Sequence, residues 1–119
     1  KFYLAAGKND IGLINKFKNS SVGKNCESFE DLSIKETLPI IKNCNLTIGN
    51  DTGFCHISAG LSVKTLIIFA DSPICYGKYS TRMTTVEPEG EKDSTKHDTL
   101  GKDRIPFNEV LSKALKLLN

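Results

Sequence analysis

Residues 45–60 constrain the fold more than any other segment, and they read Asn-Leu-Thr-Ile-Gly-Asn-Asp-Thr-Gly-Phe-Cys-His-Ile-Ser-Ala-Gly. A short apolar strand there breaks into a polar glycine turn, and the chain restarts as a helix with His56 in its first turn. Such a turn presents unpaired backbone N–H groups and the positive end of a helix dipole to a ligand. The segment therefore predicts a phosphate site.

The remaining sequence predicts an α/β fold around this segment. Short apolar runs typical of strands alternate with segments of helical periodicity, and this order favours a parallel sheet with helices on its faces. We expect strands at residues 2–6, 22–26, 46–48, 65–70 and 83–86, and helices at 11–18, 33–43, 53–61 and 106–118. The first strand is expected to be covered on both faces, and the last to lie at an edge.

Apolar positions indicate which helix faces are buried. The helix at 33–43 opens with a capping box and carries an apolar stripe formed by Ile34, Leu38 and Ile41. In the helix at 53–61, the side chains expected to pack on the sheet are Phe54, Ile57 and Leu61. The last helix has an apolar face formed by Val110, Leu111, Ala114, Leu115 and Leu118.

Composition excludes several classes of protein. The 16 basic and 14 acidic side chains nearly balance, so we expect no basic surface for DNA or RNA. The apolar run at 65–70 is too short for a transmembrane segment. The four cysteines form no CxxC pair, which favours free thiols in the cytosol.

The 119 residues are expected to form one domain over 1–119. Within it, residues 87–104 hold ten charged side chains and His97, and predict a solvated loop. Because the chain begins at Lys1, we expect it to be a piece of a longer protein.

Ligands of open α/β sheets bind at the carboxyl ends of the strands, where the loops 7–10, 49–53 and 70–73 are expected to converge. Gly53 has no side chain to keep a pyrophosphate from the backbone, and Thr52 adds a hydroxyl donor. His56 lies four residues after Thr52, and therefore on the same helix face.

Three of these residues have alternative interpretations. His56 either donates a hydrogen bond to a phosphate or sugar oxygen or packs at the start of the helix. Asp51 is an N-cap that tightens the turn, which is compatible with a ligand role. Asp10 either caps the first helix or accepts hydrogen bonds from a ribose diol. A thiol-based metal site is a separate alternative, and it would need Cys44, Cys55 or Cys75 to converge with a histidine.

At these residues the chain resembles the bacterial ADP-heptose:lipopolysaccharide heptosyltransferases, glycosyltransferase family 9, which have GT-B architecture. The family's signature is Gly-Asn-Asp-(Thr/Ser)-Gly-Pro-x-His before a small-residue helix, then a strand ending in Phe-Gly and a Thr-Asp-Pro-like turn. Here residues 49–56 read Gly-Asn-Asp-Thr-Gly-Phe-Cys-His, and Asp71-Ser72-Pro73 forms the turn. The likeness covers most of residues 2–76. Phe54 replaces the usual Pro, and Ala70 replaces the Gly after Phe69.

The resemblance implies a Rossmann-like sheet with helices on both faces, as in the C-terminal, donor-binding half of a GT-B enzyme. Asp51, Thr52 and Gly53 would hold the diphosphate of a nucleotide sugar, His56 would approach the sugar or phosphate, and Asp10, in place of the more usual Glu, would lie near the ribose.

The implied reaction is inverting transfer of a heptose from ADP-heptose to a lipopolysaccharide-type acceptor, without metal or other cofactor. A missing N-terminal domain would contain the acceptor site, the catalytic base and a lysine that contacts phosphate. This chain would then hold no catalytic residue, and alone it would bind the nucleotide sugar without turnover. The implied location is the cytoplasm, including the inner face of the inner membrane. A non-catalytic nucleotide-binding module, or a decayed transferase domain, is the alternative.

Overall fold

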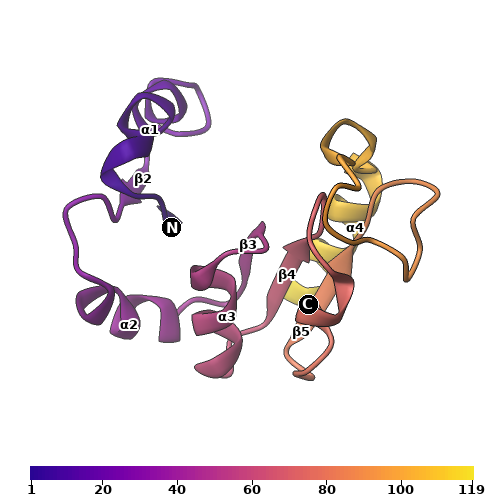
Figure 1. Ribbon diagram of the computed structural model, residues 1–119. Coiled ribbons are helices and arrows are strands. Elements are labelled where there is room, and N and C mark those ends of the chain that lie inside the picture. The colour runs from indigo at the N-terminus through magenta and orange to yellow at the C-terminus, as the bar shows by residue number, and fades with distance from the viewer. The chain divides into compact units, whose positions relative to one another are not determined.

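The computed structural model describes residues 1–119, which form two compact units, residues 1–40 (unit 1) and 41–119 (unit 2) (Figure 1). Unit 1 contains β1 (Phe2–Leu4), α1 (Ile11–Lys18), β2 (Cys26–Ser28) and most of α2 (Ile34–Lys42). Unit 2 contains β3 (Thr47–Asn50), α3 (Gly53–Gly60), β4 (Thr65–Ile68), β5 (Met83–Val86) and α4 (Phe107–Leu118). Short 3₁₀ turns lie at Lys8–Asp10, Ile74–Gly77 and Lys102–Arg104. None of the helices has the length and apolar character that a membrane crossing requires.

The strands are parallel, as predicted, and lie in two sheets. In unit 1, β1 pairs with β2 in the register Phe2 with Cys26. Contrary to expectation, β1 is not covered on both faces, because Phe2 is 71% exposed. The second strand also begins later than predicted. The amide of Gly23 donates to Ser20 Oγ, and a Cβ at residue 23 would lie 1.9 Å from the Phe17 carbonyl oxygen, so this part of the chain turns tightly against the end of α1.

The predicted capping box at the start of α2 is confirmed. The Ser33 amide donates to Glu36 Oε2 at 2.8 Å, and the Glu36 amide donates to Ser33 Oγ at 3.4 Å. The predicted apolar stripe is only partly correct, because Ile34 is 61% exposed whereas Ile41 is buried. Thr37 is also fully buried, and its hydroxyl donates to the Ile34 carbonyl, which satisfies the polar group locally.

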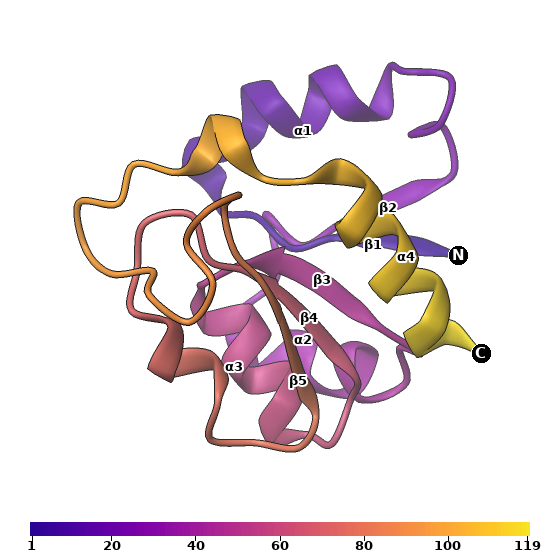
Figure 2. The same ribbon diagram turned by 90° about the vertical axis from the view of Figure 1, so that its right-hand side faces the viewer.

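The sheet of unit 2 has the order β3-β4-β5 with all strands parallel, which confirms β5 as an edge strand. Neighbouring side chains of the central strand point to opposite faces. Ile67 packs in a cluster with Cys55 of α3, and Leu66 packs with Ala114 of α4. The two helices therefore cover opposite faces of this sheet, as Figures 1 and 2 show.

The buried side of α3 differs from the prediction. Its buried residues are Cys55, Ser58 and Ala59, whereas the larger residues Phe54, Ile57 and Leu61 are only partly buried. Small side chains let this helix lie close to β3. A Cβ at Gly49 would lie 3.0 Å from Cys55 Sγ, and Thr47 Oγ1 donates to Ser58 Oγ at 2.9 Å.

Only two of the five residues in the predicted apolar face of α4 are packed against the sheet. Val110, Ala114 and Leu117 join the cluster around Leu66. Leu111, Leu115 and Leu118 are 45%, 53% and 55% exposed. The packed stripe follows the i, i+4, i+7 spacing from Val110, and it includes Leu117, which the prediction left out.

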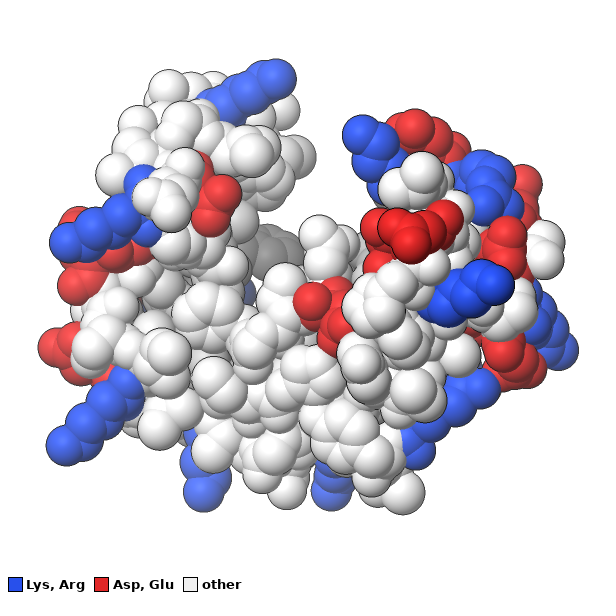
Figure 3. Space-filling view, in the orientation of Figure 1, with Lys and Arg blue, Asp and Glu red and all other residues white.

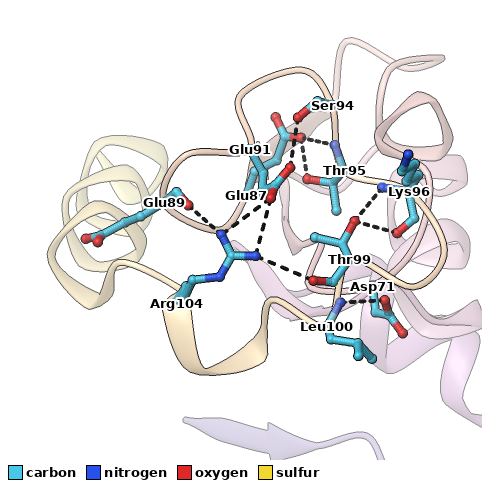
Figure 4. Close-up of polar contacts among 10 residues, drawn as sticks. All are labelled: Asp71, Glu87, Glu89, Glu91, Ser94, Thr95, Lys96, Thr99, Leu100 and Arg104. Atoms are coloured by element: carbon cyan, nitrogen blue, oxygen red, sulfur yellow. Dashed lines mark hydrogen bonds and ion pairs between the residues drawn. The ribbon is translucent and has the colours of Figure 1, made fainter.

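Residues 87–104 are not simply a solvated loop, although His97 is exposed as predicted. Thr95 is 3% exposed, and its hydroxyl donates to Glu87 Oε1 at 2.5 Å (Figure 4). The Glu87 carboxylate also accepts the amides of Asp93 and Thr95. The Arg104 guanidinium donates to the carbonyl oxygen of Glu89 and to the carboxylate of Glu91. Hydrogen bonds of Glu87, Glu91 and Arg104 within the segment thus tie it together.

This arrangement predicts an acid-sensitive loop. Burial opposes ionisation of Glu87, but the hydrogen bonds from Thr95 and the Asp93 amide prevail and lower the pKa of its carboxyl below the usual 4.5. A lowered pKa stabilises the fold at pH values above the ordinary pKa, and this contribution is lost as the pH falls through the lowered value. We therefore expect hydrogen-exchange protection of the Asp93 and Thr95 amides, corrected for intrinsic rates, to be high at pH 6 and to fall below about pH 4.5.

Glu87→Gln should reduce this protection at pH 6 and remove most of its dependence on pH. Glu89→Gln is the matched control, because the side chain of Glu89 is exposed and points away from the network in Figure 4. Protection that is independent of pH in the unchanged protein would contradict the role given to Glu87.

Candidate functional site

The predicted phosphate turn lies between β3 and α3, at the carboxyl edge of the unit 2 sheet. Thr52 is the N-cap residue of α3 in extended conformation (φ −139°, ψ 162°), and its carbonyl accepts the amides of Cys55 and His56. The Gly53 amide makes no hydrogen bond within the chain, and a Cβ at Gly53 would meet no atom within 4 Å. The first turn of this helix therefore has a backbone donor without a partner in the chain, next to a position where no side chain crowds the backbone, and helix N-termini of this kind bind anionic oxygens.

Asp51 is not the N-cap, so that interpretation is wrong. Its Oδ1 atom lies 2.7 Å from His56 Nε2, and the Asp51 side chain is only 14% exposed. The reason is geometric: the helix begins one residue later than an Asp51 cap requires, so the carboxylate lies beside the first turn, where it meets His56. The pair joins the residue that precedes the turn to the helix that follows it.

Tyr79 completes this group, and the sequence did not indicate it. Its hydroxyl lies 2.5 Å from His56 Nδ1, and the two rings stack with centroids 5.7 Å apart and an angle of 14° between their planes. Both ring nitrogens of His56 are therefore bonded within the chain, and its side chain remains 32% exposed. His56 can donate to a ligand directly only when one of these bonds is exchanged.

The loop after β4 lies at the same edge and is tied to the 87–104 segment. Asp71 Oδ1 accepts the Leu100 amide at 2.8 Å (Figure 4). The Ala70 carbonyl accepts the Gly101 amide, also at 2.8 Å. The Ile74 amide donates to the Thr95 carbonyl. The turn at residues 71–73, which the sequence singled out, is thus braced by a segment that begins at the carboxyl end of β5.

Asp10 belongs to unit 1, where it precedes the first residue of α1 as predicted. Its carboxylate makes no cap to α1, and instead accepts the Gly7 amide at 3.3 Å. This bond closes the short 3₁₀ turn before the helix. A role for Asp10 toward a ribose stays a prediction, as does convergence of the 7–10 loop with the loops of unit 2.

The surface charge of unit 2 is mixed. In Figure 3, acidic and basic side chains are interspersed over the part that carries residues 87–104 and α4. A cavity of about 440 Å³ lies beside this segment, and its charged lining is Glu87, Glu89, Lys92, Asp93, Glu109 and Lys113. Four carboxylates against two ammonium groups do not suit a diphosphate, so the turn at Gly53 is the better anion site.

The cysteines provide no metal centre. All four are free thiols, and no three His, Cys, Asp or Glu side chains gather as a metal site requires. Cys55 packs against the sheet, and burial raises the pKa of its thiol above the usual range. A buried, protonated thiol acts as a small apolar side chain, so the geometry gives no support to the thiol-based alternative.

Comparison with known protein families identifies a match for most of the chain. The family model of glycosyltransferase family 9 (heptosyltransferase) matches residues 15–102. The matched region contains the whole of the Asp51, His56 and Tyr79 group, and excludes Asp10 and α4. Comparisons with curated proteins and with solved structures found no match.

Proposed function

This chain belongs to glycosyltransferase family 9, and we propose that it is the donor-binding domain of a longer, two-domain enzyme. In this proposal it binds a nucleoside diphosphate sugar, ADP-heptose, whose sugar is transferred to a lipopolysaccharide-type acceptor. The family match supports a glycosyltransferase in general, and the finer assignment follows from the likeness of residues 49–56 to the heptosyltransferase signature.

The observation that carries the proposal is the Gly53 amide at the N-terminus of α3, which has no hydrogen-bond partner in the chain and belongs to a residue with free space at its Cβ position. A diphosphate needs hydrogen-bond donors and positive potential, and the helix terminus offers both. The Thr52 side chain is exposed beside this amide and can add its hydroxyl. In our proposal the amides around Asp51, Thr52 and Gly53 together hold the diphosphate, and His56 approaches the sugar or phosphate.

The same arrangement supports a role in the chemical step. When the sugar leaves the nucleotide, negative charge grows on the diphosphate, and prearranged N–H donors stabilise that charge. Inversion at the sugar carbon also needs a base that removes the proton of the acceptor hydroxyl. In our proposal that base and the acceptor site lie in another domain of the protein, and Asp10 contacts the ribose of the donor.

Calorimetric titration of the full-length protein tests this function. ADP-heptose, ADP-glucose, UDP-glucose and GDP-mannose are titrated separately, and we expect ADP-heptose to bind most tightly, with ADP-glucose next. Binding of none of the four contradicts the proposal. Binding of ADP-heptose without transfer to a lipopolysaccharide acceptor supports the alternative of a non-catalytic or decayed domain.

A further inference from the structure

We propose that Tyr79 is a positioning residue of the donor site, which acts through His56 to fix the Asp51 carboxylate. The inference rests on the proposed function, since it assigns Tyr79 to the same site. Three contacts within unit 2 carry it: His56 Nε2 with Asp51 Oδ1 at 2.7 Å, His56 Nδ1 with the Tyr79 hydroxyl at 2.5 Å, and the stacked rings of His56 and Tyr79.

The chemistry of the three groups sets the direction of both hydrogen bonds. An ionised carboxylate can only accept, so His56 Nε2 must carry the proton that it shares with Asp51. In the neutral imidazole, Nδ1 then has a lone pair and accepts the proton of the Tyr79 hydroxyl. The result is a chain of donors that runs from Tyr79 through His56 to Asp51.

Asp51 and the Tyr79 hydroxyl favour the same tautomer of His56, because the carboxylate needs a proton on Nε2 and a donating hydroxyl needs a lone pair on Nδ1. Without the hydroxyl, Nδ1 loses its partner and the ring is held by the Asp51 bond alone. The ring and the carboxylate then have more freedom to move. Because hydrogen bonds in a chain strengthen one another, loss of the hydroxyl is felt at Asp51, although Tyr79 does not contact it.

The positions of Asp51 and Tyr79 in the chain explain how their connection through His56 bears on ligand binding. Asp51 directly precedes Thr52 and the open Gly53 amide, whereas Tyr79 lies after β4, in the stretch between the Ile74–Gly77 turn and β5. Tyr79 is 64% exposed, and both its hydroxyl and its ring contact His56. The side chain thus links the segment before β5 to the first turn of α3, and through His56 it orients Asp51 within the proposed donor site.

The experiment compares Tyr79→Phe with the unchanged full-length protein by two readouts. Long-range ¹H–¹⁵N spectra of histidine-labelled protein report the tautomer of His56, and the signals that are missing from a His56→Gln variant assign this residue. We expect the Nε2–H tautomer of His56 in the unchanged protein, and a changed Nδ1 nitrogen shift in Tyr79→Phe, because Nδ1 loses the hydrogen bond from the hydroxyl. The dissociation constant for ADP-heptose should rise about twofold to tenfold, the range expected for one net hydrogen bond.

Tyr76→Phe is the matched control, because Tyr76 is an exposed tyrosine close in sequence whose ring meets His97 rather than His56. It should change neither the His56 nitrogen shifts nor the affinity. Unaltered His56 shifts in Tyr79→Phe, or unaltered affinity despite altered shifts, would overturn the role of Tyr79. Absence of nucleotide-sugar binding in the unchanged protein would instead overturn the proposed function, whatever the nitrogen shifts.

Discussion

A Gly53→Val protein is expected to bind ADP-heptose about tenfold to a hundredfold more weakly than the unchanged protein while keeping its fold. A Cβ at this position meets no atom within 4 Å, so valine fits without disturbing the fold, and its branched side chain adds bulk beside the backbone that the proposed diphosphate must approach. An anionic oxygen could then no longer approach the N–H group. Hydrogen bonds to charged groups contribute about 1.5–3 kcal/mol each, which corresponds to this loss of affinity.

Calorimetric titration measures the affinity, and circular dichroism checks the fold. Gly60→Val is the matched control, because Gly60 lies at the opposite end of the same helix and its added Cβ also meets no atom within 4 Å. The control should bind ADP-heptose as the unchanged protein does. Equal affinity in the Gly53 and Gly60 variants would mean that the amide does not contact the donor.

The sequence predicted the order of strands and helices in unit 2 because that order depends on local patterns. The apolar run at 65–70, the glycines that flank Asp51 and Thr52, and the helical spacing after Pro106 each indicate one element and its ends. The parallel sheet followed from the strand–helix–strand order. Each of these inferences uses residues that are close in sequence.

The errors concern choices that depend on packing. The prediction assigned the largest apolar side chains of α3 to the sheet, whereas the close approach of the helix to Gly49 selects Cys55, Ser58 and Ala59. No local pattern shows how near two elements will lie. A helix with small residues on one side and large apolar residues on the other can bury either side. The space available beside the neighbouring strand determines which side packs against it.

The polar groups were hardest to predict, because their partners are distant in sequence. His56 and Tyr79 are 23 residues apart, and Asp71 and Leu100 are 29 apart. Residues 49–56 alone indicated an anion site. They did not indicate that both ring nitrogens of His56 would be hydrogen-bonded, to Asp51 and to Tyr79. The charged segment looked solvated for a similar reason, since composition does not reveal that Glu87 and Thr95 satisfy each other.

Phe69→Ala is expected to be the most destabilising single substitution in unit 2, with a loss of about 3–5 kcal/mol in the free energy of unfolding. Phe69 is fully buried with Cys55, Ile67 and Ile74, and a Cβ at Gly77 would lie 2.5 Å from its ring. These neighbours cannot collapse into the space that the ring leaves, because they belong to the sheet, to α3 and to the turn that supports the Tyr79 segment.

Urea unfolding of the full-length protein, followed by tyrosine fluorescence and circular dichroism, measures this loss. Phe107→Ala is the matched control, since Phe107 is 72% exposed and should change the free energy of unfolding by less than about 1 kcal/mol. The site should respond as well: loss of packing beneath the Ile74–Gly77 turn frees Tyr79, and the affinity for ADP-heptose should fall below that of Tyr79→Phe. If Phe69→Ala and Phe107→Ala unfold at the same urea concentration, Phe69 does not hold the α3 face of the sheet together, and the link from this core to the donor site fails with it.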